Sequence, residues 1–250
     1  EYKNIEKKIL KKNLINLINV DYKFEKKKLN KISKNSKKFI NKSFKIAFDL
    51  INSGLTNKLI NGPISKKKFL DKKYPGITEY IAKKSNVKDV AMLIYNKKLS
   101  VCPLTTHMPL KKVHKKINKK NICNKIKLID SFYKKIRNIK PKIAVLGLNP
   151  HCESTDNFNE DEKIIKPSIK KLTKLGYLVS GPFSADTIFL KNNRKKFDVI
   201  LGMYHDQVLT PMKSLFEYDA INITLGLPFT RISPDHGPNE KMIGKNLSNP

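Results

Sequence analysis

Histidines in short polar loops are the side chains of this sequence best suited to chemistry. His107, His151 and His205 each follow an expected strand, and His236 lies in a region with few charges. Neutral imidazoles from separate strand ends can hold a divalent cation and leave positions open for a substrate, as in catalytic metal sites. Histidines that only hydrogen-bond within their own loops would show the same spacing, and no local H-x-x-x-H pair is present. The pattern alone leaves both interpretations open.

Lys213, Asn222 and Arg231 form a second candidate group. Lys213 and Arg231 are the only cations between residues 201 and 240, although the 250-residue chain carries 52 lysines and arginines. A stretch kept so clear of charge is either buried or a site. Arg231 could bind an anion through its planar, forked guanidinium group, and Lys213 could bind it as a point charge. Asn222 lies between them in the sequence. A surface lysine and a structural arginine are the alternative. Thr78 and the Gly62-Pro63 loop are further candidates for binding an anion.

The formal net charge of +31 at first suggests a nucleic-acid-binding protein, because clustered cations displace counterions from a phosphate backbone. Arginine, the side chain suited to bidentate phosphate and base contacts, contributes only three of the 52 cations. Most lysines fall in the first 150 residues, and we interpret them, together with His114, as a solvated surface. We therefore expect no nucleic-acid partner. A basic nucleic-acid-binding protein is the alternative from another functional class.

The sequence also predicts the cellular environment. No apolar run approaches the ~20 residues of a membrane span, and the N-terminus has no apolar signal core. Cys102, Cys123 and Cys152 lie far apart without a C-x-x-C spacing, which argues against disulfides and thiolate zinc sites. We expect a cytoplasmic protein without a membrane partner.

Helices and strands alternate along the chain, and the candidate side chains follow the strands. The apolar spacing predicts helices over residues 5–16, 39–51, 121–139 and 161–175 and strands over 59–60, 90–95, 99–104, 142–148, 199–204 and 220–225. The strands 90–95 and 99–104 are close enough to form a hairpin. Such alternation is typical of an α/β protein, in which ligands bind at strand ends. None of the ten glycines has the G-x-G spacing of a dinucleotide-binding Rossmann fold.

Several motifs occur in the order and near-spacing of one known family. They are Thr-Thr-His-Met-Pro-Leu at 105–110, Gly-Leu-Asn-Pro-His at 147–151, Gly-Pro-Phe-Ser-Ala-Asp-Thr at 181–187, Tyr-His-Asp-Gln at 204–207, Asn-Ile-Thr-Leu-Gly-Leu-Pro-Phe-Thr-Arg at 222–231 and Asp-His-Gly at 235–237. From about residue 49 onward, the chain resembles the 4-hydroxythreonine-4-phosphate dehydrogenase family of pyridoxal phosphate biosynthesis. Ordered motif sets of this length are highly specific.

The resemblance implies roles for seven residues. The positions that match the family's divalent-metal ligands are His107, His151 and His205, and those that match its substrate-binding residues are Thr78, Lys213, Asn222 and Arg231. Ile77 stands where well-known members have histidine, and Ser65 occupies a position that varies between family branches. These two differences leave the exact substrate open. The resemblance assigns no general base and no cofactor-contacting residue.

The family's fold is similar to that of isocitrate and isopropylmalate dehydrogenases, with two α/β domains around a central cleft. By this resemblance, residues 1–70 with 223–250 form the first domain and 71–222 the second. That fold binds nicotinamide cofactors without a Rossmann fingerprint. The family's N-terminal Gly-x-Pro-x-Gly-Ile-Gly segment and its terminal helical region are missing, so we expect both ends of this chain to be incomplete relative to the family.

The resemblance also implies an activity. It is the oxidation of 4-phosphooxy-L-threonine to 2-amino-3-oxo-4-phosphooxybutanoate, which decarboxylates to 3-amino-2-oxopropyl phosphate. The cofactors would be NAD or NADP and one divalent ion, either zinc, magnesium or cobalt. The alternative is a related dehydrogenase that acts on erythronate or threonate 4-phosphate. A homodimer with a shared active site is implied, in which metal ligands come from both subunits.

Overall fold

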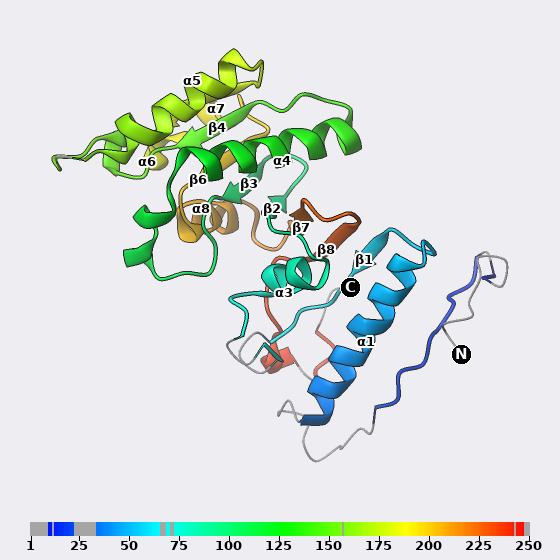
Figure 1. Ribbon diagram of the computed structural model, residues 1–250. Coiled ribbons are helices and arrows are strands. Elements are labelled where there is room, and N and C mark those ends of the chain that lie inside the picture. Colours follow the sequence, from blue (N-terminus) through cyan, green and yellow to red (C-terminus); the bar gives the residue numbers. More distant parts are fainter. Residues whose placement is uncertain are drawn as a thin grey trace.

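One continuous mixed sheet runs through the protein, and helices cover both of its faces (Figure 1). The computed structural model describes residues 10–11, 13–22, 34–65, 69–70, 73–156, 158–242 and 244–247. In this part of the chain eight strands pair in the order β1-β8-β7-β2-β3-β6-β4-β5. The strands are β1 Lys58–Ile60, β2 Ala91–Tyr95, β3 Ser100–Pro103, β4 Ile143–Leu146, β5 Val179–Phe183, β6 Val199–Gly202, β7 Ile221–Leu225 and β8 Thr230–Pro234.

Strand direction changes across the sheet. The neighbours β3, β6, β4 and β5 are parallel, whereas β2 runs antiparallel to both β3 and β7. β8 runs antiparallel to β7 and parallel to β1. This register places Asn222 beside Ile94 of β2 and Arg231 beside Thr224 of β7. Two candidate substrate-binding residues therefore come from adjacent strands.

The helices pack by their apolar stripes on the two faces of the sheet. They are α1 Lys34–Asn52, α3 Ile77–Lys84, α4 Lys119–Arg137, α5 Lys166–Lys174, α6 Ala185–Ile188, α7 Lys191–Arg194 and α8 His205–Phe216, with 3-10 turns at Leu110–Lys112, His114–Lys116, Pro150–Cys152 and Glu240–Met242 and a π-helical turn at Asp161–Ile165. In α4 the buried residues Ile122, Ile126 and Ile129 recur at helical spacing and face the sheet. α8 lies on the opposite face from α4 (Figure 1).

Three groups of buried side chains form the core. Because side chains alternate across a strand, Leu93 and Leu201 pack with α4 and α5, and Ile94 and Ile200 pack with α8. The third group lies at the β1–β8 end of the sheet, where α1 and α3 join it. Its buried members are Phe44, Phe69, Leu70, Tyr80, Ile81 and Phe229. This last group supports the N-terminal end of α3, which carries candidate site residues.

Most predicted elements are present, with shifted ends. The α/β class and the hairpin of residues 90–95 and 99–104 are confirmed. The predicted helix 161–175 consists of the π-helical turn followed by α5. The described positions of the predicted helix 5–16, namely 10–11 and 13–16, are not helical, and its other positions lie outside the described residues. The predicted surface position of His114 is confirmed.

Four elements were not predicted from the sequence pattern, namely α3, β5, α8 and β8. β8 contains only one aliphatic side chain, Ile232, and ends in Pro234; β5 contains Gly181 and Pro182, and α8 contains Pro211. Proline and glycine weaken a strand or helix pattern, although β5 tolerates them as the edge strand. α3 is only eight residues long. Tertiary packing, rather than local preference, sets these elements.

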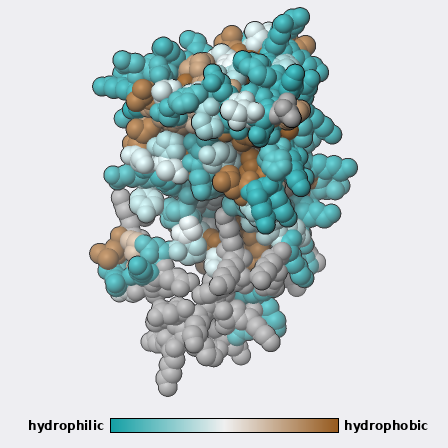
Figure 2. Space-filling model, turned by 90° about the vertical axis from the view of Figure 1, so that its left-hand side faces the viewer, coloured by the Kyte–Doolittle hydropathy of each residue, from teal (hydrophilic) through white to brown (hydrophobic). Residues whose placement is uncertain are grey.

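The surface is largely hydrophilic, as the abundance of lysine leads us to expect. Figure 2 shows teal side chains over most of the described surface on that face, with apolar side chains in small patches. No helix within the described ranges is long and apolar enough to span a membrane.

Candidate functional site

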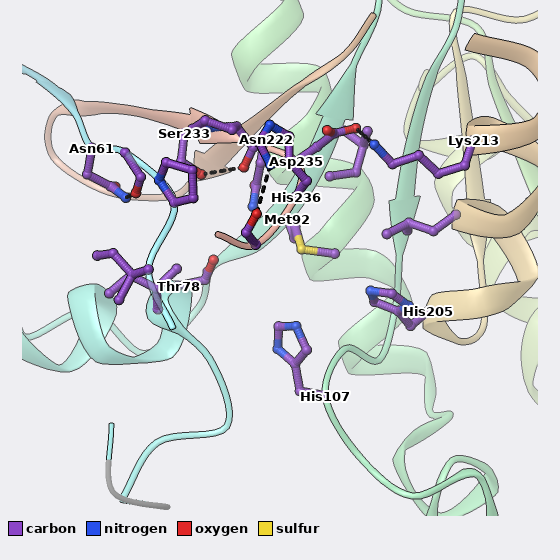
Figure 3. A pocket seen from close by; sticks show the side chains of 18 of the residues that line it. Asn61, Thr78, Met92, His107, His205, Lys213, Asn222, Ser233, Asp235 and His236 are labelled. Atoms are coloured by element: carbon purple, nitrogen blue, oxygen red, sulfur yellow. Dashed lines mark hydrogen bonds and ion pairs between the residues drawn. The ribbon is translucent and has the colours of Figure 1, made fainter. Parts of the chain in front are cut away.

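A cavity of about 610 Å³ lies where α3, α8 and the strands β2, β7 and β8 meet (Figure 3). All four residues predicted to bind substrate line it, and so do two of the three predicted metal ligands. Its polar lining includes Asn61, Thr78, His107, His205, Asp206, Lys213, Asn222, Arg231, Asp235 and His236. Ile77, Met92 and Ile94 contribute apolar walls. The structure thus brings together side chains separated by more than 150 positions in the sequence.

Arg231 is a fully buried cation in the wall of this cavity. Its Nε donates to Asn61 Oδ1 at 2.9 Å and its Nη1 to Thr224 Oγ1 at 3.1 Å. Nη2 is buried and has no hydrogen-bond partner in the described part of the chain. Burial lowers the pKa of Arg231 to about 10, so it stays protonated at neutral pH. A buried charge held only by neutral acceptors is costly, and an anion in the cavity would compensate it.

Lys213 reaches the cavity from α8 and pairs with Asp235, which follows β8 (Figure 3). The Lys213 Nζ lies 2.5 Å from Asp235 Oδ2, and the Asp235 side chain is only 1% exposed. The same Nζ lies 5.0 Å from the centre of the Tyr218 ring, which also stands edge-on to His236. Lys213 is therefore held between a carboxylate and an aromatic face.

Three buried polar atoms of the cavity residues lack hydrogen-bond partners among the described residues: Arg231 Nη2, Asn222 Oδ1 and Asp235 Oδ1. Buried polar groups in native proteins are nearly always paired. The donor, Arg231 Nη2, could bind an anionic group of a ligand. The two acceptors, Asn222 Oδ1 and Asp235 Oδ1, could bind its hydroxyl or amino protons. A small phosphorylated hydroxy acid or amino acid has this composition.

His107 and His205 lie near each other at the cavity, with ring centroids 5.7 Å apart (Figure 3). Two imidazoles bound to one tetrahedral zinc ion place their centroids about 5 Å apart, so this pair fits a single divalent cation. The Nδ1 of His205 lies 2.6 Å from Asp206 Oδ1, and the Nδ1 of His107 lies 3.7 Å from Glu79 Oε1. A carboxylate therefore stands beside each of the two rings, on the side of its Nδ1 atom.

The carboxylate of Glu79 is held in its charged form. Burial by itself would raise the pKa of Glu79, but the neighbouring His107 ring and hydrogen bonds from its own backbone amide and Thr106 outweigh burial and lower the pKa to about 2. A negative group therefore stands beside the His107 ring at neutral pH.

His151 lies apart from the other two predicted ligands. It is exposed in the 3-10 turn after β4, with a φ of 55°, and it is not among the residues that line the cavity. Across the described ranges, no group of three or more His, Cys, Asp or Glu side chains is arranged to hold a metal. One chain thus supplies two of the three imidazoles to the cavity.

Four polar residues at or beside the cavity were not among the predicted site residues, namely Asn61, Glu79, Asp206 and Asp235. Asp235 and Asp206 lie within motifs quoted for the resemblance, but nothing in their residue type distinguishes them from surface polar groups. One feature of the sequence could have pointed to Asp235 as a site residue: it is an acidic residue within the cation-poor stretch of residues 201–240. His236 lines the cavity, and its Nδ1 contacts the carbonyl of Gly237.

Comparison with known proteins agrees with the resemblance. The chain is 46% identical over 196 residues to the 4-hydroxythreonine-4-phosphate dehydrogenase of Sulfurihydrogenibium sp., a match that covers 77% of this chain and 60% of the relative. It is 41% identical over 165 residues to the D-threonate 4-phosphate dehydrogenase of Pectobacterium atrosepticum, covering 66% of this chain and 51% of the relative. The chain therefore spans less than two thirds of the length of these relatives.

A solved structure shows the same fold. The structure titled as a putative 4-hydroxythreonine-4-phosphate dehydrogenase from Salmonella typhimurium superposes with a TM-score of 0.75 at 33% identity, covering 88% of this chain and 68% of that one. The family model described as pyridoxal phosphate biosynthetic protein PdxA matches residues 1–250. The chain belongs to the PdxA family of pyridoxal phosphate biosynthetic proteins.

Proposed function

We propose that the protein oxidises 4-phosphooxy-L-threonine to 2-amino-3-oxo-4-phosphooxybutanoate, which then loses CO₂ to give 3-amino-2-oxopropyl phosphate. One observation carries this proposal. The cavity combines an uncompensated buried cation, Arg231, with an imidazole pair, His107 and His205. An anionic hydroxy substrate would bind the first and present its hydroxyl to the second.

The cavity residues divide into two functional groups. Arg231 and Lys213 bind the phosphate or carboxylate groups of the substrate, since both are cations in the cavity wall. Asn222 and Thr78 bind its other polar groups, because Asn222 has an unmet acceptor and Thr78 is buried against the cavity. Arg231 and Asn222 come from paired strands, so the sheet sets the spacing between them.

A divalent cation and a nicotinamide cofactor complete the proposal. His107 and His205 would hold a zinc, magnesium or cobalt ion, and a second copy of the chain would supply His151. The ion would supply Lewis-acid polarisation of the substrate hydroxyl and the product ketone, and NAD or NADP would accept the hydride. The exposed position of His151, away from the cavity, supports a homodimer with shared sites.

The two-domain arrangement of isocitrate and isopropylmalate dehydrogenases belongs to the same proposal. We assign residues 1–70 with 223–250 to one domain and 71–222 to the other. The separate aromatic core around Phe44 and Phe229 supports the first domain, and the cores on the two faces of the sheet support the second. The cavity is lined by residues of both assigned domains, as expected of a central cleft. We expect the enzyme to act in the cytoplasm.

D-Threonate 4-phosphate is the alternative substrate. A relative at 41% identity carries that name, and the apolar side chain of Ile77 lines the cavity beside Thr78. The two substrates differ at C2, where an amino group is replaced by a hydroxyl group. Formation of NADH or NADPH should be measured with each compound, with the metal added. Turnover of 4-phosphooxy-L-threonine is expected to be faster, and turnover of the threonate alone would contradict the first choice.

Replacing Asp235 with Asn should raise the KM for the phosphorylated substrate by about tenfold. This factor corresponds to the loss of one hydrogen bond between a charged group and the substrate. The substitution removes the buried carboxylate that holds Lys213 at the cavity, and Lys213, which is one-third exposed, can then turn toward solvent. Steady-state kinetics would measure this effect. Glu162→Gln is the control, because Glu162 is an exposed carboxylate paired with Lys166 and does not line the cavity. An unchanged KM in Asp235→Asn would contradict the assigned role of the ion pair.

A further inference from the structure

The His107 ring stands between two cavities. It lines the main cavity and also a neighbouring one of about 310 Å³, whose lining includes Glu79 and Thr106 but no Thr78. Two successive residues of α3 therefore line different cavities: Thr78 lines the main cavity and Glu79 lines the second. Glu79 lies behind His107 as seen from the main cavity.

Two contacts tie the Glu79 carboxylate to the His107 loop. Thr106 Oγ1 donates a hydrogen bond of 2.9 Å to Glu79 Oε1, and the same oxygen lies 3.7 Å from His107 Nδ1. Both side chains are largely buried, with exposed fractions of 26% for Glu79 and 20% for His107. Since Thr106 immediately precedes His107, the carboxylate is held at a fixed place beside the ring.

The backbone of Gly76 lies against both the Glu79 carboxylate and the His107 ring. It is the N-cap residue of α3, and a Cβ atom placed on it would lie 2.6 Å from both Glu79 Oε2 and His107 Nδ1. Such distances are far below van der Waals contact. The backbone at Gly76 thus packs directly against the carboxylate and the ring, and any side chain there would displace one of them.

We propose that Glu79 is a positioning residue that holds the His107 ring and its loop in place at the main cavity, where the imidazole binds a divalent cation. This inference rests on the metal site of the proposed function. Carboxylate partners of metal-binding histidines fix the ring and raise its basicity, and their loss typically costs 10–100-fold in metal affinity. Asp206, the corresponding partner of His205, is 79% exposed and is therefore more strongly screened by water. Glu79 has the more protected position.

The test compares Co²⁺ binding by the unaltered full chain and by Glu79→Gln, using competition with a chromogenic chelator and the visible spectrum of the bound ion. We expect affinity to fall about 10–100-fold and the spectrum to change in Glu79→Gln. Glu162→Gln is the matched control, and it should bind Co²⁺ like the unaltered protein. Gly76→Ala keeps the carboxylate but moves the pair, so its Co²⁺ affinity should fall as well. Circular dichroism would establish that each variant is folded.

The outcomes separate this inference from the proposed function. If the unaltered protein binds Co²⁺ and folded Glu79→Gln binds it equally tightly with the same spectrum, the positioning role is wrong and the metal site stands. If the unaltered protein binds no Co²⁺, both the proposed metal site and this inference are wrong. Weakened Co²⁺ binding in Glu79→Gln supports the positioning role even if neither phosphorylated substrate is turned over.

Discussion

A mixture of His107→Ala and His151→Ala subunits is expected to show activity that neither variant has alone. Each homodimer should lose about 10³-fold in kcat, because the several kcal/mol that a Lewis acid contributes correspond to such a factor. In a mixed dimer, one site has lost both replaced imidazoles, while the other keeps all three. Random pairing makes half of the dimers mixed, so about one quarter of the unaltered activity should return.

This expectation follows from the separation of the three histidines. His107 and His205 share a cavity within one chain, whereas His151 is exposed on another loop. A mixture of His107→Ala and His205→Ala is therefore the matched control, because every site in that mixed dimer lacks one imidazole. Subunits would be exchanged by unfolding and refolding together, and activity would be followed by NADH or NADPH formation. Equal recovery in both mixtures, or none in the first despite mixed dimers, would contradict the shared site.

Replacing Arg231 with Met should abolish anion binding and leave the ligand-free protein about as stable as before. The guanidinium is fully buried, and no carboxylate of the described residues forms an ion pair with it. Removing an uncompensated buried charge saves its desolvation cost, and this gain offsets the loss of the hydrogen bonds from Arg231 to Asn61 and Thr224. Loss of hydrogen bonds between a charged group and the substrate costs ~1.5–3 kcal/mol each, so KM should rise about 10–100-fold or more.

Denaturant unfolding with and without inorganic phosphate would measure both effects. A ligand present at about 100 times its Kd stabilises the folded state by about 2.7 kcal/mol, and Arg231→Met should lose this gain. Arg194→Met is the control, because Arg194 is partly buried and donates to the Phe189 carbonyl outside the cavity. Retention of the phosphate effect in Arg231→Met would show that the anion binds elsewhere. A large loss of ligand-free stability would show that Arg231 mainly supports the fold.

The sequence alone predicted the main elements and six residues of the cavity lining, namely Thr78, His107, His205, Lys213, Asn222 and Arg231. The buried strands β2, β3, β4 and β6 are continuous apolar runs, a signal that does not depend on distant contacts. The hairpin of β2 and β3 needed only a short polar connection. β8 and β5 could not be predicted in this way, because charged, proline and glycine residues interrupt their apolar pattern. Their parallel partners, β1 for β8 and β4 for β5, are also distant in sequence.

The net charge of +31 and its distribution could also be interpreted from the sequence alone. The lysines are unevenly distributed along the chain. This distribution already indicated that Lys213 and Arg231, the only cations between residues 201 and 240, are candidate site residues. The motifs at the strand ends then determined the family and the seven candidate residues. These signals are local, because they depend on residue type and spacing along the chain.

Only the tertiary structure decided how those residues are paired and buried. Pairing of β7 with β8 buries Arg231 beside neutral acceptors, and the loop after β8 brings Asp235 to Lys213. The start of α3 at Gly76 places Glu79 behind His107, and the turn after β4 keeps His151 away from the cavity. The physical reason is that charge compensation and ligand geometry depend on distances between segments far apart in sequence, which residue type and local spacing do not determine.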